Sequence, residues 1–503
     1  MSVTRRFMRH GALVAAALAV ALIAGPRASA QQAGIDPPPF RWSAERMAAM
    51  AAAFRDDLDH IPGEVLVKFR PGMGPAAQAS ALSVLRGDMP ASDQHWLGDL
   101  LLVRAPGEPD VEQMAARLAA QPEVEYAHPN YLSRTQQAVT PNDPFFNQQW
   151  NFNAINMPLA WEINPGGSPS VTVAVIDTGA TQAAETFNFQ LWTGSRFETL
   201  PIPYGVNPDF NVTQMLPGRD FVFFTAGTPV LDMVGHGTHV AGTIVQATNN
   251  NLGLAGIAYQ SRFLPLKACF GYWEVQIVQS FNNIPGFVPP SNMGGCPTSA
   301  VVEAIRYAAD QGAHVINLSL GGFNAVPAYQ DALQYAVGRG AFVAISAGND
   351  FESGNRRSYP ASYAASLDGA MSVAALGNTN ARAYYSNTGD YVEIAAPGGN
   401  TRQGSAALIY QASLSFADLN PSTVIIPRFD RYVVSPSQGT SMASPHVAGL
   451  AALLHSQGIT SPAAKEAAIK RFARDLGTAG RNNEYGHGLI DARATLRGLG
   501  LAR

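Results

Sequence analysis

The chain has 503 residues, more than one ordinary domain needs, which favours several domains or segments removed during maturation. Hydrophobic residues make up 47% of it and charged residues only 14%, which permits a large core and argues against disorder. The net charge of -4 gives no support to a nucleic-acid partner or to binding at an anionic membrane.

Residues 1–30 have the pattern of a cleaved secretory signal peptide. Arg5, Arg6 and Arg9 form a basic start, an apolar run covers 11–24, and Ala28–Ala30 offers a cleavage site. The apolar run is shorter than the roughly 20 residues that span a bilayer, which disfavours a retained membrane anchor. We therefore expect a secreted protein, outside the cell or in the periplasm of a bacterium with two membranes, with no anchor after signal cleavage.

Residues 31–56 are expected to form a polar linker and a short helix, and residues 57–134 a small α+β domain. The linker is Pro-rich, and the helix is expected over 43–55. Inside the domain, strand-like apolar runs alternate with a helix that begins after Asp110 and has one apolar face. The expected strands are 63–69, 99–105 and 124–130.

From residue 135 to residue 503, apolar strands alternate with helical segments. Several strands are almost continuously apolar, as is typical of strands buried on both faces of a sheet. The pattern predicts an α/β fold in which a parallel sheet is covered by helices on both sides. The expected strands are 170–177, 313–320, 340–346, 370–376 and 391–397, and the expected helices are 298–311 and 328–337.

Three excursions, 181–204, 270–293 and 403–434, interrupt this alternation. Each is longer than an ordinary connection, and we expect them at the rim of the functional site. The second lies between the two cysteines of the chain, Cys269 and Cys296. Because export places these in an oxidising compartment, a disulfide contributing roughly 3–4 kcal/mol is favoured over two unpaired buried thiols.

Candidate catalytic residues lie in three short segments. Asp177 follows an apolar strand, at the edge where open α/β sheets place their sites, although a strand-end Asp is also common in turns and helix caps. His236 lies between two glycines at the start of a helix-like run, and histidine has a pKa near working pH. We interpret the nearby His239 as a packed support residue, because a zinc pair of the HExxH type needs another spacing and a glutamate.

Ser441 is expected at a loop-to-helix junction, before a helix over about Met442–His455. The free N–H groups and the positive end of that helix would then lie at the serine, so its amide can stabilise an oxyanion while its hydroxyl attacks. Pro445 is expected in the first turn, where a missing N–H does little harm. For the neighbouring Ser437 and Ser444, helix capping is the simpler interpretation. Carboxylate, imidazole and hydroxyl together are the parts of hydroxyl-based acyl transfer.

The chain resembles the subtilisin family of serine peptidases over about 142–491. The resemblance rests on the residues and the order of three segments, VAVIDTGA, VGHGTHVAGTI and QGTSMASPHVAGL. The resemblance implies a subtilisin-like parallel sheet sandwiched by helices. It also implies a serine endopeptidase that hydrolyses polypeptide substrates through an acyl-enzyme, with Asp177, His236 and Ser441 as its triad. We expect the enzyme to be a monomer.

The same resemblance implies further site residues. Asn349, in SAGND, matches the family's side-chain oxyanion donor. The segment SLGG resembles the edge that pairs with an extended peptide, and its glycines leave space for the P1 side chain. Gly294–Cys296 is expected at the opposing edge. The residues of the SLGG edge are Ser319, Leu320, Gly321 and Gly322.

A structural calcium site is implied by ATNNNLGLAGIA (247–258), which resembles the family's calcium loop. The expected ligands are all oxygen atoms, as calcium prefers. An Asn-rich turn without a metal is the alternative. The ligands would be the side chain of Asn250, the carbonyls of Thr248, Leu252 and Leu254, and the carboxylates of Asp143 and Asp209.

The domain at 57–134, with PGEVLVKF and VEYAHPN, resembles the inhibitor-type propeptide of subtilisins, a small ferredoxin-like α+β domain. This implies a zymogen whose propeptide is both folding chaperone and inhibitor, and which processes itself by cleavage within 133–141. An ordinary N-terminal accessory domain is the alternative.

Two other functions are alternatives to a subtilisin-like peptidase. A sedolisin-like acid peptidase would have a glutamate in place of the histidine, and His236 within an intact HGTH segment argues against it. A non-catalytic binding protein on the same fold should have lost at least one of the four central residues. All four are present: Asp177, His236, Asn349 and Ser441.

Overall fold

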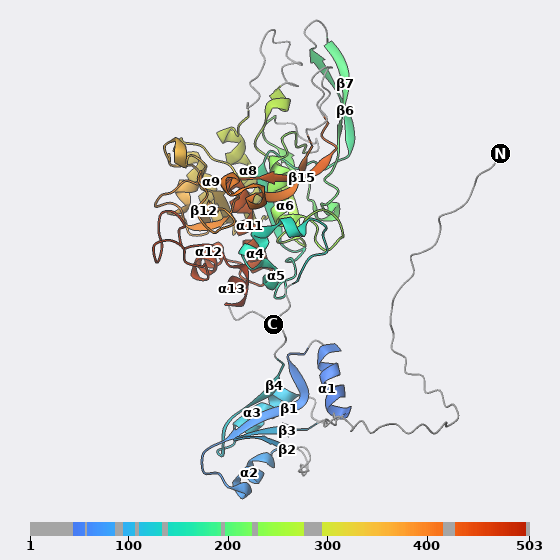
Figure 1. The fold of residues 1–503 in the computed structure, drawn as a ribbon, viewed down its shortest axis with the longest axis vertical. Coiled ribbons are helices and arrows are strands. Elements are labelled where there is room, and N and C mark those ends of the chain that lie inside the picture. Colours follow the sequence, from blue (N-terminus) through green and yellow to red (C-terminus); the bar gives the residue numbers. More distant parts are fainter. Residues whose placement is uncertain are drawn as a thin grey trace, which may run out of the picture. The chain divides into compact units, whose positions relative to one another are not determined.

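The chain forms two compact units, Met1–Ser133 and Arg134–Arg503, which are drawn in Figure 1. The computed structural model describes residues 44–55, 58–85, 94–105, 110–132, 139–192, 197–223, 230–275, 294–415 and 428–498. The predicted signal peptide, the Pro-rich linker and most of the predicted maturation segment lie outside the described residues.

The N-terminal unit is an antiparallel sheet with the strand order β2-β3-β1-β4. After the first helix, its elements follow the order strand, helix, strand, strand, helix, strand, which is the ferredoxin-like arrangement expected from the sequence. Its elements are α1 (Ala44–Arg55), β1 (His60–Phe69), α2 (Pro75–Leu82), β2 (Gln94–Leu97), β3 (Leu100–Arg104), α3 (Val111–Ala119) and β4 (Val124–Tyr131).

Helix α3 forms as its sequence pattern indicates. The Asp110 side chain accepts a hydrogen bond from the Gln113 amide (2.9 Å), which caps the helix. Val111, Met114 and Leu118 lie on one face and are buried in the core of this unit. By contrast, α2 and β2 carry little apolar patterning, because most of their residues are exposed.

The C-terminal unit is built on a seven-stranded sheet with the order β13-β12-β11-β10-β5-β9-β8, and all its pairings are parallel. The central strands are buried along their whole length, which explains their continuous apolar runs. The strands of this sheet are β5 (Thr172–Asp177), β8 (Arg219–Asp220), β9 (Arg262–Lys267), β10 (Val315–Leu318), β11 (Phe342–Ser346), β12 (Ala370–Leu376) and β13 (Ile394–Pro397).

Helices flank this sheet as the sequence pattern predicts (Figure 1). Helix α11 packs on β10 to β13 and against α6, whereas α8 packs against α9 and contacts β5 and β9. Among the described helices, none combines the length and the apolar character needed to cross a membrane. The helices are α4 (Trp150–Ala154), α5 (Met157–Ala160), α6 (His236–Val245), α8 (Thr298–Asp310), α9 (Pro327–Gly338), α10 (Ala361–Ala364), α11 (Thr440–Ser456), α12 (Pro462–Arg471) and α13 (Ala492–Arg497).

The long excursions add two antiparallel hairpins. The first joins β6 (Glu185–Trp192) to β7 (Phe197–Tyr204), and the second joins β14 (Ile409–Leu414) to β15 (Tyr432–Ser437). They meet where Tyr204 pairs with Phe429, and Trp273 from the remaining excursion packs against the same apolar cluster. Three excursions that are far apart in sequence therefore share one small core. The buried members of that core are Ile202, Tyr204, Met233, Leu414 and Phe429.

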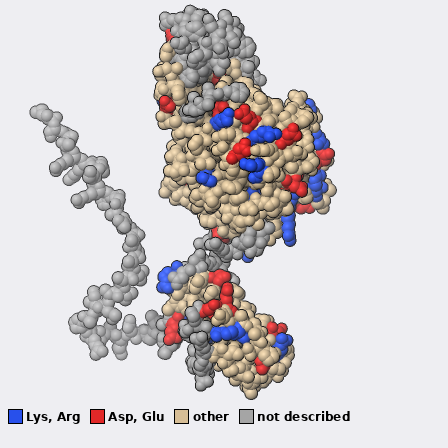
Figure 2. Space-filling view, turned by 180° about the vertical axis from the view of Figure 1, so that it is seen from behind, with Lys and Arg blue, Asp and Glu red and all other residues tan. Residues whose placement is uncertain are grey.

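The described surface carries charges of both signs. On the face shown in Figure 2, acidic and basic side chains of the C-terminal unit are interspersed rather than separated into large areas of one sign. This distribution agrees with the small net charge of -4.

Candidate active site

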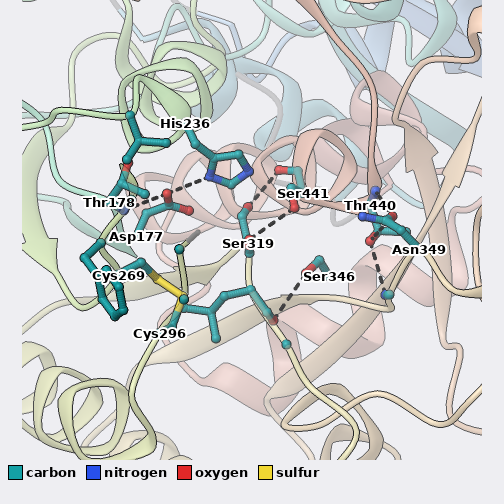
Figure 3. Close-up of a pocket in the computed structure, with 18 of the residues that line it drawn as sticks. Asp177, Thr178, His236, Cys269, Cys296, Ser319, Ser346, Asn349, Thr440 and Ser441 are labelled. Atoms are coloured by element: carbon teal, nitrogen blue, oxygen red, sulfur yellow. Dashed lines mark hydrogen bonds and ion pairs between the residues drawn. A yellow bond between two sulfur atoms is a disulfide. The ribbon is translucent and has the colours of Figure 1, made fainter. Parts of the chain in front are cut away.

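The three predicted catalytic side chains lie in one cleft at the carboxyl edge of the sheet. Asp177 is the last residue of β5, His236 is the first residue of α6, and Ser441 is the second residue of α11. All three line a cavity of about 910 Å³. In Figure 3 the imidazole of His236 lies between the carboxylate of Asp177 and the side chain of Ser441.

A short contact joins Asp177 to His236. Their Oδ1 and Nδ1 atoms are 2.6 Å apart, and the same Oδ1 accepts the Thr178 amide at 2.7 Å. Asp177 is buried, and within the described residues its Oδ2 has no hydrogen-bond partner. Because Nδ1 donates its proton to a carboxylate, the Nε2 atom of the neutral imidazole carries the free lone pair.

The environment of His236 changes its proton affinity. Burial acts to lower the pKa of His236, but the charge and the hydrogen bond of Asp177 oppose it, as does the charge of Asp232. The net result is a pKa above the ordinary value of histidine. A proton taken up by this imidazole is therefore held more firmly than one on a free histidine.

Asp232 is a site residue that sequence reasoning missed. It is fully buried, and its carboxylate accepts hydrogen bonds from the end of β5 and from the start of α6. Asp232 thereby fixes the helix that carries His236 against the strand that carries Asp177. Its position four residues before His236, just ahead of a helix, was the available signal. The donors are Thr178 Oγ1 (3.0 Å), Val234 N (2.9 Å), Gly235 N (2.8 Å), Thr238 N (3.1 Å) and Thr238 Oγ1 (2.6 Å).

Ser441 makes a different contact from the one its predicted role requires. Its hydroxyl donates to the carbonyl of Ser319 at 3.1 Å, and between the described side chains of Ser441 and His236 there is no direct hydrogen bond. Bonding to His236 therefore requires the hydroxyl to leave Ser319. Such catalytic contacts are often loose in enzymes without substrate.

Helix α11 begins at Thr440, two residues earlier than predicted, so Ser441 lies in its first turn and its amide has no partner within the helix. Pro445 consequently falls in the second turn, and the prediction that it lies in the first turn is wrong. A proline there removes the N–H that would bond to the Ser441 carbonyl. The Ser319 hydroxyl donates to that carbonyl instead, at 2.7 Å.

Asn349 lies after β11, and Thr440 orients its side chain in the cleft. Its Oδ1 accepts the amide of Thr440 (2.9 Å) and the hydroxyl of Thr440 (2.8 Å), which leaves Nδ2 free of these contacts. A Cβ placed on Gly439 would lie 3.5 Å from Asn349 Nδ2 and 3.6 Å from the Ser441 amide nitrogen. Two N–H donors of the kind that bind an oxyanion therefore border the same small space.

The predicted substrate edge follows β10. Gly322 exchanges both its backbone hydrogen bonds with Tyr359 (2.9 and 2.8 Å), so its amide and carbonyl are occupied. In the described part of the chain, the amide and carbonyl of Gly321 have no backbone partner. On the opposite side of the cleft, Gly295 pairs with Phe270. The open backbone groups needed for pairing with a peptide thus lie at Gly321.

Comparison with known proteins identifies the family. Residues 168–488 match the subtilase family, and residues 46–130 match the fervidolysin N-terminal prodomain. The chain belongs to the subtilase family. It is a serine-type endopeptidase with an N-terminal prodomain, as its sequence segments predicted.

Relatives with named activities support this assignment. The chain is 31% identical to a thermophilic serine proteinase of Bacillus sp. (strain AK1), over 85% of this chain and 86% of the relative. It is 32% identical to thermitase of Thermoactinomyces vulgaris, over 70% and 98%. An extracellular protease of Xanthomonas campestris pv. campestris is 32% identical, over 78% of this chain and 62% of the relative.

Solved structures agree with the fold. A protease from Pseudoalteromonas arctica PAMC 21717 aligns with a TM-score of 0.52 and 28% identity, over 71% of this chain and 99% of that chain. Fervidolysin from Fervidobacterium pennivorans aligns with a TM-score of 0.50 over 87% of this chain and 61% of that chain. Its identity of 20% supports the fold alone.

The predicted disulfide between Cys269 and Cys296 is present in this subtilase, and both cysteines line the cleft. The Cys269 amide donates to the carbonyl of Asp177 at 3.0 Å, and Gly295 next to Cys296 pairs with Phe270. The bridge thus ties the edge of the cleft to the end of β5. Most of the chain between the cysteines, 276–293, lies outside the described residues.

The predicted calcium residues gather around one loop. The carboxylate of Asp209 is buried and accepts hydrogen bonds from the side chains of Gln246 (2.6 Å) and Asn250 (2.7 Å) and from the Leu254 amide (3.0 Å). Asp143 is also buried and accepts the amide of Asn250 at 3.3 Å. Burial, followed by the charge of Asp143, raises the pKa of Asp209 despite these hydrogen bonds.

The oxygen atoms around this loop fit a calcium ion chemically. Among the described residues, the carbonyls of Thr248, Leu252 and Leu254 accept no backbone hydrogen bond. Two neighbouring buried carboxylates without a cation are costly, which favours a bound cation. The described residues hold no group of three or more His, Cys, Asp or Glu side chains suited to a metal, so such a site depends on carbonyl ligands.

His239 has the supporting role expected of it. Its Nε2 lies 3.1 Å from the carbonyls of Ile409 and Ser435, and so joins α6 to the β14–β15 hairpin. Burial, together with the charge of His236, lowers the pKa of His239 to about 4. The imidazole is therefore neutral at the pH where His236 would work.

Proposed function

We propose that this subtilase is an exported endopeptidase that cleaves peptide bonds through a triad of Asp177, His236 and Ser441. The observation that carries the proposal is the 2.6 Å contact between Asp177 and His236, in the same cleft as Ser441. Asp177 holds the imidazole in the tautomer whose Nε2 accepts a proton, and it stabilises the imidazolium that forms.

Acylation begins when the Ser441 hydroxyl attacks the scissile carbonyl carbon and its proton passes to His236 Nε2. The carbonyl oxygen becomes an oxyanion, which the amides of Ser441 and Asn349 stabilise by hydrogen bonds. The C–N bond then breaks, and His236 returns the proton to the leaving amine. Water attacks the resulting ester by the same route in reverse and releases the acid.

The substrate that fits this cleft is an extended polypeptide. Its backbone would pair with Gly321 on one side and with the Gly294–Cys296 segment on the other, at Gly294 and Cys296, because both backbone groups of Gly295 are bonded to Phe270. Such pairing recognises the main chain of the substrate more than its sequence. The Ser319 carbonyl is engaged by Ser441 in the free enzyme and becomes available for a substrate amide once the hydroxyl moves.

We further propose secretion and self-maturation. The N-terminal signal pattern, the prodomain match over 46–130 and a relative named as an extracellular protease support this route. The prodomain at 57–134 would act as folding chaperone and inhibitor, and cleavage within 133–141 would release it from the mature enzyme at 135–503. The mature enzyme would be a monomer without a membrane anchor.

The test compares wild type with Ser441→Ala in a host that lacks other secreted proteases. We expect a fluorophosphonate probe to label wild type alone, and the variant to accumulate as a precursor after signal removal. Ser437→Ala, a nearby serine on β15, is the matched control and should label and mature normally. Labelling of Ser441→Ala, or its normal maturation, would contradict the proposal.

We also propose that Asp143, Asp209, Asn250 and the three loop carbonyls hold a structural calcium ion. The ion would link the start of the peptidase unit, at Asp143, to the loop after α6. Calcium at 100 times its Kd should raise the unfolding free energy by about 2.7 kcal/mol. Asp209→Asn should lose most of this response in thermal melts with calcium or a chelator, whereas the surface change Asp310→Asn should keep it. Identical melting of wild type with calcium and with chelator would rule out the site.

A further inference from the structure

The disulfide between Cys269 and Cys296 lies in the wall of the cleft. Both cysteines line the cavity, and Figure 3 shows the bridge on the side of Asp177 rather than on the side of Asn349. Cys269 is buried, whereas Cys296 is partly exposed. Cys296 is therefore the member of the pair that a small thiol in the cleft can reach. Because the chain has two cysteines in all, a thiol reagent can act on this bridge alone.

Few contacts hold the Gly294–Cys296 segment, which is the predicted second edge for a peptide. Gly295 and Phe270 exchange both of their backbone hydrogen bonds (2.9 and 3.0 Å). Cys269 and Cys296 form the next pair of this short antiparallel ladder, a position without backbone hydrogen bonds between the two residues. Among the described residues, no other hydrogen bond joins the segment to the rest of the protein. The disulfide is thus the main link that keeps the segment against the strand end beside the cleft.

The end of β5, by contrast, is held by contacts that do not involve sulfur. The carbonyl of Asp177 accepts the amides of Ala268 (2.9 Å) and Cys269 (3.0 Å). The carbonyl of Thr178 accepts Lys267 Nζ at 2.8 Å. Main-chain groups and a buried lysine make these bonds, so they persist when the disulfide opens. The strand end that carries Asp177 therefore keeps its position without the bridge.

We propose that this disulfide is a redox-sensitive switch for peptide binding: when closed it presents the Gly294–Cys296 edge to an extended substrate, and when open it weakens peptide binding but leaves the catalytic chemistry in place. This inference rests on the proposed function, since it concerns substrate binding at the same site. In the reduced enzyme the segment must be ordered again each time a peptide binds, which costs conformational entropy. The Gly321 edge follows β10 and does not depend on the bridge.

The opening reaction is a thiol–disulfide exchange with an external thiol. Its thiolate attacks the Sγ atom of Cys296, the S–S bond of the protein breaks, and Cys269 leaves as a thiolate that takes up a proton. A second thiolate attacks the mixed disulfide and releases Cys296, which is protonated in turn. Two external thiols are thereby oxidised to one disulfide, while the protein disulfide is reduced to two thiols. A disulfide reagent such as oxidised glutathione reverses the reaction.

The experiment compares two substrates of the matured enzyme before and after treatment with dithiothreitol. One is an internally quenched peptide long enough to pair with both edges, and the other is p-nitrophenyl acetate, which needs only the triad and the oxyanion donors. We expect reduction to raise KM for the peptide about tenfold, the cost of ordering about one more backbone residue on binding. The kcat for the peptide and the rate on the ester should change by less than about twofold. Oxidised glutathione should restore the original KM.

Cys269→Ala/Cys296→Ala is the matched variant, because it lacks the bridge permanently. Its KM for the peptide should equal that of reduced wild type and should not respond to dithiothreitol. Alkylation followed by mass spectrometry should find two free thiols in reduced wild type that still hydrolyses the ester. The comparison of oxidised with reduced wild type does not depend on the folding of the variant.

A KM that is unchanged by reduction, or a bridge that opens only when urea unfolds the protein, would overturn the inference and leave the proposed function intact. A parallel loss of ester and peptide hydrolysis would also overturn it, because the bridge would then support the triad itself. A double variant that still responds to dithiothreitol would exclude the bridge as the cause. Oxidised wild type that cleaves neither substrate and does not label with fluorophosphonate would overturn both the inference and the proposed function.

Discussion

His236 lies under the influence of two buried carboxylates that act in different ways. Asp177 bonds directly to the imidazole at 2.6 Å, whereas Asp232 fixes the first turn of α6 and affects the imidazole through its charge. Both carboxylates favour the protonated ring, and burial opposes them. The pH at which activity falls on the acid side of the profile should therefore depend on the charges of both carboxylates.

Asp232→Asn tests this effect. In the proposed triad His236 acts as a base only when it is neutral. The negative charge of Asp232 raises the pKa of His236, so removing that charge should move the acid limb of kcat/KM to lower pH. The active fraction is normalised by fluorophosphonate titration, because the change also disturbs buried hydrogen bonds. Asp310→Asn, on the surface, should leave the limb in place. An acid limb that stays unchanged or moves to higher pH in Asp232→Asn would contradict this role.

At the scale of elements, a buried ion pair joins β9 to the excursion beside the cleft. Lys267 Nζ, at the end of β9, donates to Glu274 Oε1 and to the carbonyl of Thr178, each at 2.8 Å. Both charged side chains are almost fully buried. Burial acts to lower the pKa of Lys267, but the charge of Glu274, followed by that of Asp232, raises it above its ordinary value. This pair thus holds the helical turn at 272–275 against the strand next to Asp177.

Replacing one member of this ion pair should lower the unfolding free energy more than replacing both members. Lys267→Met and Glu274→Met each leave one buried charge without its partner, so each should lower the unfolding free energy by about 3–5 kcal/mol. The double variant should be much less destabilised than the sum of the two. Urea unfolding of all four proteins measures the coupling. Additive losses would show that the two side chains do not act as a pair.

The sequence patterns correctly predicted those helices and strands whose residue types are determined by burial. The buried strands β5, β10, β11 and β12 read as apolar runs, whereas β9 was missed because it begins and ends with a basic residue and contains Pro265. The predicted catalytic segments could be recognised because small residues surround each candidate side chain. Asp232 was not recognised, because an aspartate three residues before a glycine can be taken for an ordinary turn residue. The sequence also did not indicate that the Ser319 hydroxyl would donate to the Ser441 carbonyl in place of the N–H that Pro445 lacks. That contact depends on the residue at which α11 begins, which helix propensity does not determine to within one residue.

At the scale of the whole molecule, the three excursions gather into one core because of contacts between distant segments. The pairing of Tyr204 with Phe429 joins positions more than 200 residues apart, which no local pattern indicates. Buried histidines also link distant elements. His446 on α11 bonds to Asn151 on α4 (2.9 Å) and to the Met442 carbonyl, and His239 joins α6 to the second hairpin.

These histidines should make the fold sensitive to acid. Burial lowers the pKa of His446, like that of His239, from 6.5 to about 4, so between these values the unfolded chain binds more protons than the folded one. Stability is thus fully present above pH 6.5 and falls as the pH drops towards 4, by about 1.4 kcal/mol per pH unit for each histidine. His446→Gln should show a shallower loss in urea unfolding across this window. An equal slope in wild type and variant would contradict the assignment.

The proposed catalysis requires Asp177, His236 and Ser441 to act together beside two oxyanion donors. A crystal structure of the matured enzyme with a peptidyl phosphonate tests this directly. We expect a covalent bond from Ser441 Oγ to phosphorus, with Ser441 Oγ released from Ser319 and a phosphonyl oxygen within hydrogen-bond distance of Asn349 Nδ2 and the Ser441 amide. We also expect Asp177 to remain bonded to His236. An adduct on another residue, or a phosphonyl oxygen that points away from both donors, would contradict the account.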